Sequence, residues 1–183
     1  DSFTFNIFHY LSELGAKVKV FRNNKISTKE VFDFNPKCIV LSPGPKTPDD
    51  AGICLDIIKK NNNIPLLGIC LGHQSIGQGH GGKIIQCNEI MHGKVDNIKH
   101  NNNSIFKNIE QNFQATRYHS LTIERKSLPN NLEIIAETSN KIIMGVAHKS
   151  KKTYGLQFHP ESIGTSTGKT ILKNFLDIID YES

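Results

Sequence analysis

The sequence predicts an α/β fold in which a mixed, mostly parallel sheet carries helices on both faces. Between residues 2 and 80, helix-like segments alternate with short apolar runs, which is typical of parallel sheets covered by helices. The second half instead holds short strand-like runs between turn residues, which favours additional antiparallel strands. A chain of 183 residues is long enough to bury well over half of its unfolded surface. We therefore expect one domain over residues 1–183.

In the first half, the spacing of apolar residues and the helix end signals define each element. Apolar residues recur at helical spacing over residues 2–14, and Gly15 follows as a stop signal, so this segment is expected to be a helix. The next expected elements are a strand at 16–21 (AKVKVF), a short helix from the capping box at Ser27 to Phe34, a strand at 37–42, a rigid loop at 43–48, a helix at 49–60 and a strand at 64–69.

The second half is expected to complete the sheet with short strands and to end in a helix. The expected strands lie at 83–87, 113–118, 132–137, 142–148 and 153–158, and the helix lies at about 166–179. We find no linker and no internal repeat in the sequence.

Composition and charge exclude several classes of function. Apolar residues make up 37% and charged residues 21% of the chain, and no apolar run approaches the roughly 18 residues of a membrane span. The net charge is +5, but the lysines are scattered and form no basic stripe with aromatic partners, so no nucleic-acid or membrane partner is expected. The four cysteines form no Cys-x-x-Cys pair, which argues against a disulfide framework and favours a reducing compartment. We expect a cytoplasmic protein, or a plastid stromal one if it is organelle-encoded.

Three motif types that would bind a nucleotide or a metal do not fit their context. GQGHGG, at 77–82, matches G-x-G-x-x-G but follows a predicted helix where the dinucleotide motif needs a preceding strand. GTSTGKT, at 164–170, resembles a phosphate loop but is one residue short. The histidines and cysteines lack zinc-ligand spacing. No metal and no cofactor are therefore expected.

The segment Gly68-Ile69-Cys70-Leu71-Gly72 predicts a nucleophile. It lies between a predicted strand and a predicted helix, which is the strand, G-x-nucleophile-x-G, helix arrangement of a nucleophile elbow. The helix that begins at Leu71 directs its amide groups at the sulfur and favours the thiolate. A buried structural cysteine is the alternative interpretation.

A base for this cysteine is predicted in LQFHPES, where His159 and Glu161 are two residues apart just after a strand. Side chains at this spacing share a face of an extended backbone, and Pro160 stiffens the link between them. His159 could then exchange a proton with Cys70 while Glu161 fixes its tautomer.

Five motifs in order resemble the class I, triad-type glutamine amidotransferases, and in particular the small subunits of anthranilate and aminodeoxychorismate synthases. The motifs are LSPGPKTPDDAG, PLLGICLGHQSIG, MHGK, TRYHSL and LQFHPES, and the resemblance runs from about Asp1 to Phe175. MHGK and TRYHSL favour this branch over the amidotransferase domains of carbamoyl-phosphate or GMP synthesis. The resemblance implies a flavodoxin-like fold of the class I amidotransferase type.

The resemblance also implies a reaction, a set of site residues and a partner. Cys70 would attack the side-chain amide of glutamine, His159 would protonate the leaving ammonia, and Glu161 would complete the triad. Amides near Leu71 and Gly44 would hold the oxyanion. The residues implied to bind glutamine are Gly44, Pro45, Lys46, Gln74, Ser120 and Leu121. The ammonia would pass to a separate, larger subunit that aminates chorismate, giving anthranilate or, alternatively, aminodeoxychorismate.

The chain departs from the family pattern at two places. Lys46 stands where the pattern PGPG has a glycine, so a backbone contact could be kept there but a glycine-only conformation could not. The family also has a short apolar strand before the segment that corresponds to Asp1, so we expect such a strand upstream, near the middle of the sheet.

Two other functions are compatible with the sequence. The chain could be an inactive regulatory subunit, although the three triad residues are present, or a stand-alone cysteine hydrolase on a similar scaffold.

Overall fold

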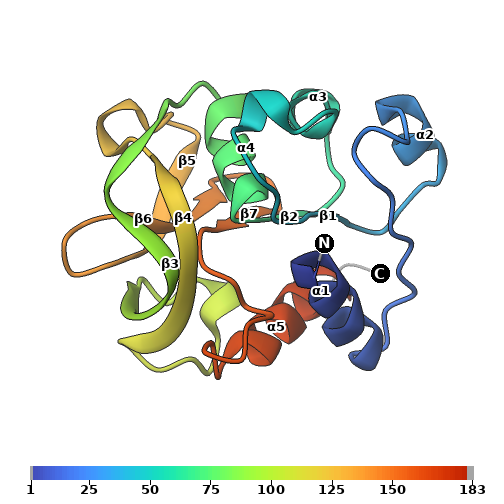
Figure 1. The fold of residues 1–183 in the computed structure, drawn as a ribbon. Coiled ribbons are helices and arrows are strands. Elements are labelled where there is room, and N and C mark those ends of the chain that lie inside the picture. The colour runs from blue at the N-terminus through green and yellow to red at the C-terminus, as the bar shows by residue number, and fades with distance from the viewer. Residues whose placement is uncertain (1, 181–183) are drawn as a thin grey trace.

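The computed structural model describes residues 2–180, and its centre is a seven-stranded mixed sheet (Figure 1). The strand order is β1-β2-β7-β6-β5-β3-β4. The strands are β1 (Ile39–Leu41), β2 (Leu66–Ile69), β3 (Ile84–His100), β4 (Phe113–Ile123), β5 (Leu132–Glu137), β6 (Ile143–His148) and β7 (Thr153–Leu156). β1, β2 and β7 are parallel, and the other four neighbouring pairs are antiparallel.

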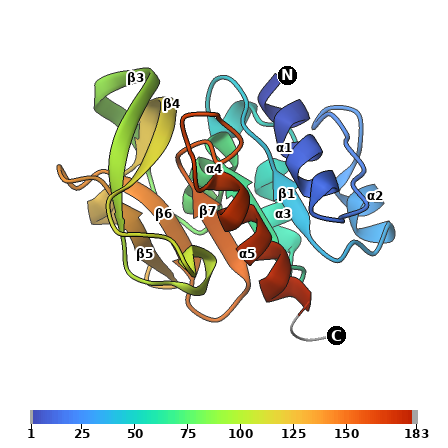
Figure 2. The same ribbon diagram turned by 90° about the horizontal axis from the view of Figure 1, so that it is seen from below.

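Helices cover both faces of the parallel part of the sheet, as the sequence predicts. Helices α3 (Cys54–Lys60) and α4 (Leu71–Gly79) lie on one face, and α1 (Ser2–Glu13) and α5 (Gly168–Asp180) lie on the other (Figure 1). Seen from below, α1 and α5 lie in front of the sheet (Figure 2). The short helix α2 (Thr28–Asp33) lies at the β1 edge. None of the helices between residues 2 and 180 is long and apolar enough to cross a membrane.

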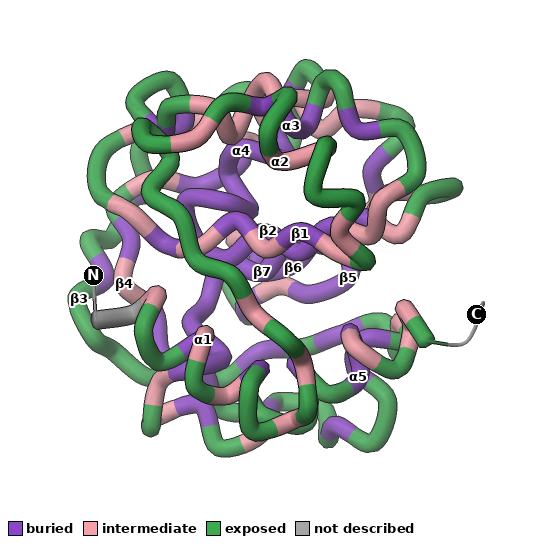
Figure 3. The backbone as a smooth tube through the Cα atoms, turned by 90° about the vertical axis from the view of Figure 1, so that its right-hand side faces the viewer, coloured by how far each residue is buried: buried purple, intermediate pink, exposed green. Residues whose placement is uncertain are grey.

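The central strands are buried, and the core is divided between the two faces of the sheet (Figure 3). Successive residues of β2 alternate between the two clusters: Leu66 packs with Ile57 and Ile76 of α3 and α4, and Leu67 packs in the cluster that contains α1 and α5. This alternation follows from the two-residue period of a strand. β2 is therefore a fully buried strand with packing on both faces, and Cys70 follows its last residue.

Local signals predict several helix ends correctly. Ser27 and Glu30 form the expected capping box, in which each side chain accepts a hydrogen bond from the other residue's backbone. Gly15 has φ +96°, a left-handed conformation that ends α1. The helix expected at 49–60 is divided, because Gly52 has φ +58° and separates a 3-10 turn (Pro48–Asp50) from α3.

Three expectations about the sheet are wrong. Residues 16–21 form no strand, because they have no hydrogen-bonded partner strand in the described part of the chain and an extended segment needs one. The sheet is mixed but not mostly parallel, because the second half adds four antiparallel pairings to the two parallel ones. The strand expected at 83–87 continues to His100 as β3, with register shifts between Gln86 and Met91 and between His92 and Lys94 that interrupt the apolar pattern.

Candidate active site

Cys70 lies at a strained turn between β2 and α4, with φ +54° and ψ −101°. The flanking glycines are sterically required there. A Cβ on Gly68 would lie 2.5 Å from the backbone of Gly72, and a Cβ on Gly72 would lie 2.2 Å from the carbonyl oxygen of Leu41. The strand and the helix can approach this closely only because both residues lack a side chain. This is the elbow geometry that the sequence predicts.

The parallel pairing of β2 with β7 brings Cys70 and His159 to one edge of the sheet. Cys70 follows β2 and His159 lies three residues after β7, and parallel neighbours end at the same edge. The amide of Cys70 donates a hydrogen bond of 2.8 Å to the carbonyl oxygen of Leu156, the last residue of β7. Residues 89 positions apart in the chain are thus brought into one site.

His159 is buried and forms a pair with Glu161. Its Nδ1 lies 2.5 Å from Oε1 of the Glu161 carboxylate, and both side chains are almost completely inaccessible. Burial alone would lower the pKa of His159, but hydrogen bonding to Cys70 and Glu161, together with their charges, raises it to about 9. His159 is therefore held in the protonated form at neutral pH, next to the sulfur.

The backbone around His159 is fixed by neighbouring segments. Its amide donates to the carbonyl oxygen of Thr116 on β4 at 3.0 Å, and its own carbonyl oxygen accepts a hydrogen bond of 2.7 Å from the hydroxyl of Thr165. The ring of Tyr118 lies edge-on to the imidazole, with 5.2 Å between the ring centroids. The ring is thus packed and its nitrogen Nδ1 is bound to Glu161, which leaves Nε2 as the ring atom for proton exchange.

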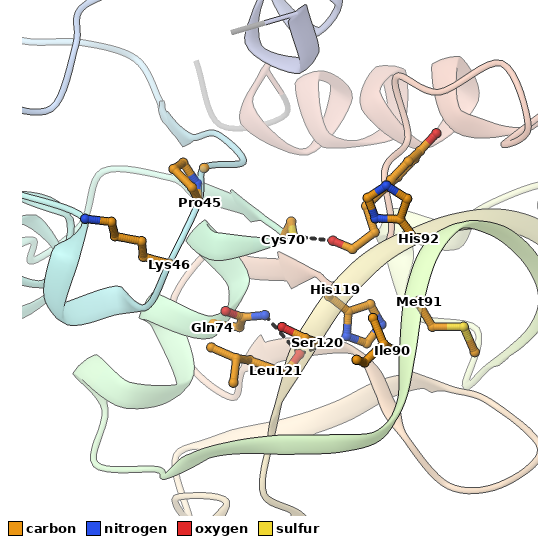
Figure 4. Close-up of a pocket in the computed structure, with 12 residues that line it drawn as sticks. Pro45, Lys46, Cys70, Gln74, Ile90, Met91, His92, His119, Ser120 and Leu121 are labelled. Atoms are coloured by element: carbon orange, nitrogen blue, oxygen red, sulfur yellow. Dashed lines mark hydrogen bonds between the residues drawn. The ribbon is translucent and has the colours of Figure 1, made fainter.

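A pocket of about 320 Å³ opens above Cys70 (Figure 4). All six residues that the resemblance implies for glutamine binding line it together with the cysteine: Gly44, Pro45, Lys46, Gln74, Ser120 and Leu121. The loop that contains Gly44 passes over the start of α4, since a Cβ on Gly44 would lie 3.0 Å from Cδ2 of Leu71. The two amides expected to hold an oxyanion therefore belong to adjacent segments.

Lys46 takes a backbone conformation that usually favours glycine, with φ +68°. This left-handed region is open to non-glycine residues at a cost of about 1–2 kcal/mol, so it is not the glycine-only conformation that a lysine would exclude. Its side chain is exposed and its amino group points away from Cys70 (Figure 4). Lys46 therefore lines the pocket without directing its amino group at the sulfur.

Sequence reasoning missed one wall of the pocket and a buried amide beside the sulfur. Further lining residues are Ile90, Met91, His92, Tyr118 and His119. Gln157 is fully buried; its Nε2 lies 3.7 Å from the sulfur of Cys70, and its Oε1 accepts a hydrogen bond from Gln74. Gln157 stands in the LQFHPES motif, but its residue type alone gives no signal of a contact with Cys70. The MHGK motif includes two of these residues, Met91 and His92, but the motif alone did not indicate that they face the pocket.

A β-bulge explains how the MHGK segment reaches the pocket. The pairing of β3 with β4 shifts register between His92 and Lys94, where Gly93 has φ +74°. A Cβ on Gly93 would lie 3.0 Å from the ring of Tyr118. Glycine is therefore needed at this bulge, which lets the pocket wall pack against β4.

Comparison with known sequences places the chain among amidotransferases. Residues 1–179 match the family described as Glutamine amidotransferase class-I. The chain is 50% identical to anthranilate synthase component 2 of Cyanophora paradoxa over 182 residues, which cover 98% of this chain and 96% of that protein. It is 46% identical to the bifunctional protein TrpGD of Thermotoga maritima over 185 residues, but it spans only 31% of that longer protein.

A solved structure has a similar fold. A protein of Thermoplasma acidophilum, provisionally named as one of the subunits of GMP synthase, superposes with a TM-score of 0.85 at 27% sequence identity, over 96% of this chain and 87% of that one. The fold, the family match and the close relatives agree with the resemblance that the five motifs carry. The chain belongs to the class I glutamine amidotransferase family.

Proposed function

We propose that this chain hydrolyses L-glutamine and delivers the ammonia to a larger synthase subunit that makes anthranilate from chorismate. The observation that carries the proposal is the position of Cys70, at a strained elbow on the floor of a pocket and beside the buried pair of His159 and Glu161. A structural cysteine would need neither the strain nor the pocket.

In the first half of the reaction, the sulfur of Cys70 attacks the carboxamide carbon of glutamine. The protonated His159 favours the thiolate and then gives its proton to the departing nitrogen, so that the C–N bond breaks and ammonia leaves. Glu161 holds Nδ1 of the ring and stabilises its positive charge. The amides of Leu71 and Gly44 are the proposed donors to the oxyanion.

In the second half, water attacks the glutamyl thioester and His159 accepts its proton. The C–S bond then breaks, glutamate leaves, and the thiolate of Cys70 is restored. The pocket supports glutamine as substrate, because it is a small site with carbonyl, amide and hydroxyl groups around the nucleophile.

The synthase partner is proposed from the relatives, which are named component 2 of anthranilate synthase or belong to fused proteins of tryptophan synthesis. These names favour anthranilate over aminodeoxychorismate as the product of the complex. Purification of the complex and identification of its chorismate-derived product distinguish the two partners. Transfer of ammonia to the synthase would exclude a stand-alone cysteine hydrolase.

The nucleophile is tested by Cys70→Ser in the complex with the synthase. We expect glutamine-dependent synthesis to fall by about a thousandfold or more, since a hydroxyl is a far weaker nucleophile here, while synthesis from ammonium salt stays near the wild-type rate. Cys87→Ser is the matched control, because Cys87 is buried on β3 and does not line the pocket. Equal loss with both nitrogen sources would show that Cys70 is structural, and full glutamine activity would refute its catalytic role. Inactivity of the wild type with glutamine would favour the regulatory subunit.

A further inference from the structure

A partly buried ion pair lies behind the pocket wall formed by β4. The guanidinium of Arg117 is completely buried and donates a hydrogen bond of 2.8 Å from Nη1 to Oδ2 of Asp96 on β3. Burying an arginine costs several kcal/mol of desolvation, and apolar residues of similar volume often replace such pairs without loss of stability. The presence of this pair beside a binding pocket therefore calls for a function other than stability.

Arg117 fixes the tautomer of His119. Its Nε–H donates to Nε2 of His119 at 3.0 Å, so that nitrogen must carry the lone pair and Nδ1 must carry the proton. Nδ1 lies 2.8 Å from the carbonyl oxygen of Leu121 and donates to it. Burial lowers the pKa of His119 to about 4, and the charge of Arg117 adds to this effect while the hydrogen bond to Leu121 opposes it.

The carbonyl oxygen of Leu121 is where this chain of hydrogen bonds meets the pocket. It also accepts a hydrogen bond of 3.1 Å from Nε2 of Gln74 (Figure 4), and the same Nε2 lies 3.2 Å from Oε1 of Gln157. Both lone pairs of this oxygen are therefore used by protein donors. The Ser120–Leu121 rim of the pocket is held from behind by His119 and from the floor by Gln74.

We propose that Asp96, Arg117 and His119 form a positioning device that fixes the Ser120–Leu121 backbone for recognition of the substrate. His119 is its central member, because one ring nitrogen accepts a hydrogen bond from the buried Arg117 guanidinium and the other donates to the carbonyl oxygen of Leu121. This inference rests on the proposed glutamine chemistry, and it assigns to these residues an effect on substrate affinity instead of on bond breaking. A preorganised rim lowers the ordering cost of binding.

Three variants test the device. His119→Leu removes both hydrogen bonds of the ring. His119→Asn keeps an amide donor near the position of Nδ1 and loses the acceptor for Arg117. Asp96→Asn removes the charge that orients Arg117 while the site stays partly exposed, so that folding is little affected. The matched control is His100→Asn, because His100 is also buried and bridges two backbone groups, Asn102 N and Ile109 O, outside the pocket.

Two readouts separate binding from chemistry and from stability. The first is the split between KM and kcat for glutamine hydrolysis in the complex with the synthase. The second is the protection of Cys70 from iodoacetamide by glutamine, followed by mass spectrometry of the Cys70 peptide, which needs no turnover. Burial raises the pKa of Cys38 and Cys54 to about 11, so these two thiols react slowly at neutral pH.

For His119→Leu we expect the KM for glutamine and the protecting concentration to rise about tenfold, with kcat changed less than about threefold. For His119→Asn we expect KM to rise only about threefold, which is half of the tenfold effect on a logarithmic scale. Asp96→Asn should also raise KM by about threefold. His100→Asn should lower the unfolding midpoint and leave KM unchanged.

Wild-type KM in the folded His119 variants, or in Asp96→Asn if His119→Leu does not fold, would overturn the proposal. A KM rise in His100→Asn equal to that in His119→Leu would also overturn it, since it would reveal a general effect of stability. A wild-type chain that neither hydrolyses glutamine nor is protected by it would instead refute the proposed function.

Discussion

Two non-glycine residues of the pocket have left-handed backbone conformations, and the strain has a different consequence at each. At Cys70, with φ +54°, the turn holds the sulfur above the end of β2. At Lys46, with φ +68°, the amino group of the side chain points away from the sulfur. Strained residues persist where the surrounding packing determines them, and Gly68 and Gly72 provide that packing around Cys70.

Replacing Lys46 with glycine should stabilise the protein without changing the chemistry. The substitution relieves about 1–2 kcal/mol of backbone strain, and the greater freedom of glycine in the unfolded chain offsets about 0.5–1 kcal/mol, so we expect a net gain of about 0.5–1 kcal/mol. Lys141→Gly, at φ +69° and outside the pocket, is the control; it also loses the exposed ion pair with Glu137, so it should gain somewhat less. Urea unfolding measures both, and a tenfold rise in the glutamine KM of Lys46→Gly alone would show that the lysine side chain contacts substrate.

Substitutions of His159 and of Glu161 should reduce glutamine hydrolysis to different extents. His159→Ala should remove nearly all glutamine hydrolysis, whereas Glu161→Gln should leave a measurable residual rate. The reason is that loss of the proton donor lowers the rate more than loss of the carboxylate that orients it. Glu161 helps to raise the pKa of His159 to about 9, so activity should decline as pH rises through about 9 in the wild type and at lower pH in Glu161→Gln. An alkaline limb at the same pH in both proteins would exclude Glu161 as the partner that sets it.

At the scale of elements, the approach of α4 to β1 and β2 decides the geometry of the site. Gly72 lies against the backbone of Leu41, and Gly77 of the same helix lies against the side chain of Ile123. The first contact leaves no room for movement, because its obstacle is a carbonyl group in the sheet. The second can relax, because its obstacle is a side chain.

Gly72→Ala and Gly77→Ala should therefore have unequal effects although both gain about 1 kcal/mol of helix propensity. A Cβ at position 72 would lie 2.2 Å from a carbonyl oxygen, and we expect a net loss on the order of 3 kcal/mol together with loss of activity. A Cβ at position 77 would meet Ile123 Cδ1 at 2.7 Å, for a net loss of about 1 kcal/mol that Ile123→Val partly restores. Similar unfolding midpoints for the two glycine variants would contradict this account.

The elements themselves were predictable where local signals decide them. β5 occupies the expected residues 132–137, and α1, α2 and α5 lie within one or two residues of the expected ends. Residues 16–21 have the alternation of a strand but pair with no strand between residues 2 and 180, and alternation cannot reveal whether a partner is present. β3 was underestimated because a bulged strand loses the regular pattern from which strands are recognised.

At the scale of the whole molecule, buried histidines link stability to pH with opposite signs. His73 and His119 are buried neutral, and burial lowers their pKa values from 6.5 to about 3 and about 4. His159 is buried charged, with its pKa raised from 6.5 to about 9. Protonation of His73 and His119 therefore favours the unfolded chain, whereas protonation of His159 favours the folded protein.

We predict that the free energy of unfolding falls on both sides of about pH 6.5. Below pH 6.5, His73 and His119 take up protons in the unfolded chain but stay neutral in the folded protein. Each therefore lowers the free energy of unfolding by up to about 1.4 kcal/mol per pH unit until its folded pKa is reached. The contribution of His159 is fully present below pH 6.5 and is lost as pH rises through about 9. Urea unfolding at pH 4.5, 6.5 and 8.5 measures the curve.

The acid side of the curve has its own control. His119→Asn should give a shallower fall between pH 6.5 and 4.5, whereas the exposed His9→Asn should parallel the wild type. Parallel slopes for wild type and His119→Asn would mean that His119 titrates freely in the folded protein.

The sequence by itself predicted the candidate nucleophile and its candidate acid-base partner, and it determined the order of the motifs. These features depend on spacings of two residues, Gly68 and Gly72 each two positions from Cys70 and His159 two positions from Glu161, and such spacings fix relative positions on any strand or tight turn. The tertiary structure decided which distant segments meet: β2 beside β7, the bulged β3 as a pocket wall, and Gln157 at the sulfur. It also decided the burial of Arg117 behind His119. The physical reason is that hydrogen bonds and burial between such segments depend on the pairing of strands far apart in the chain, which no local pattern encodes.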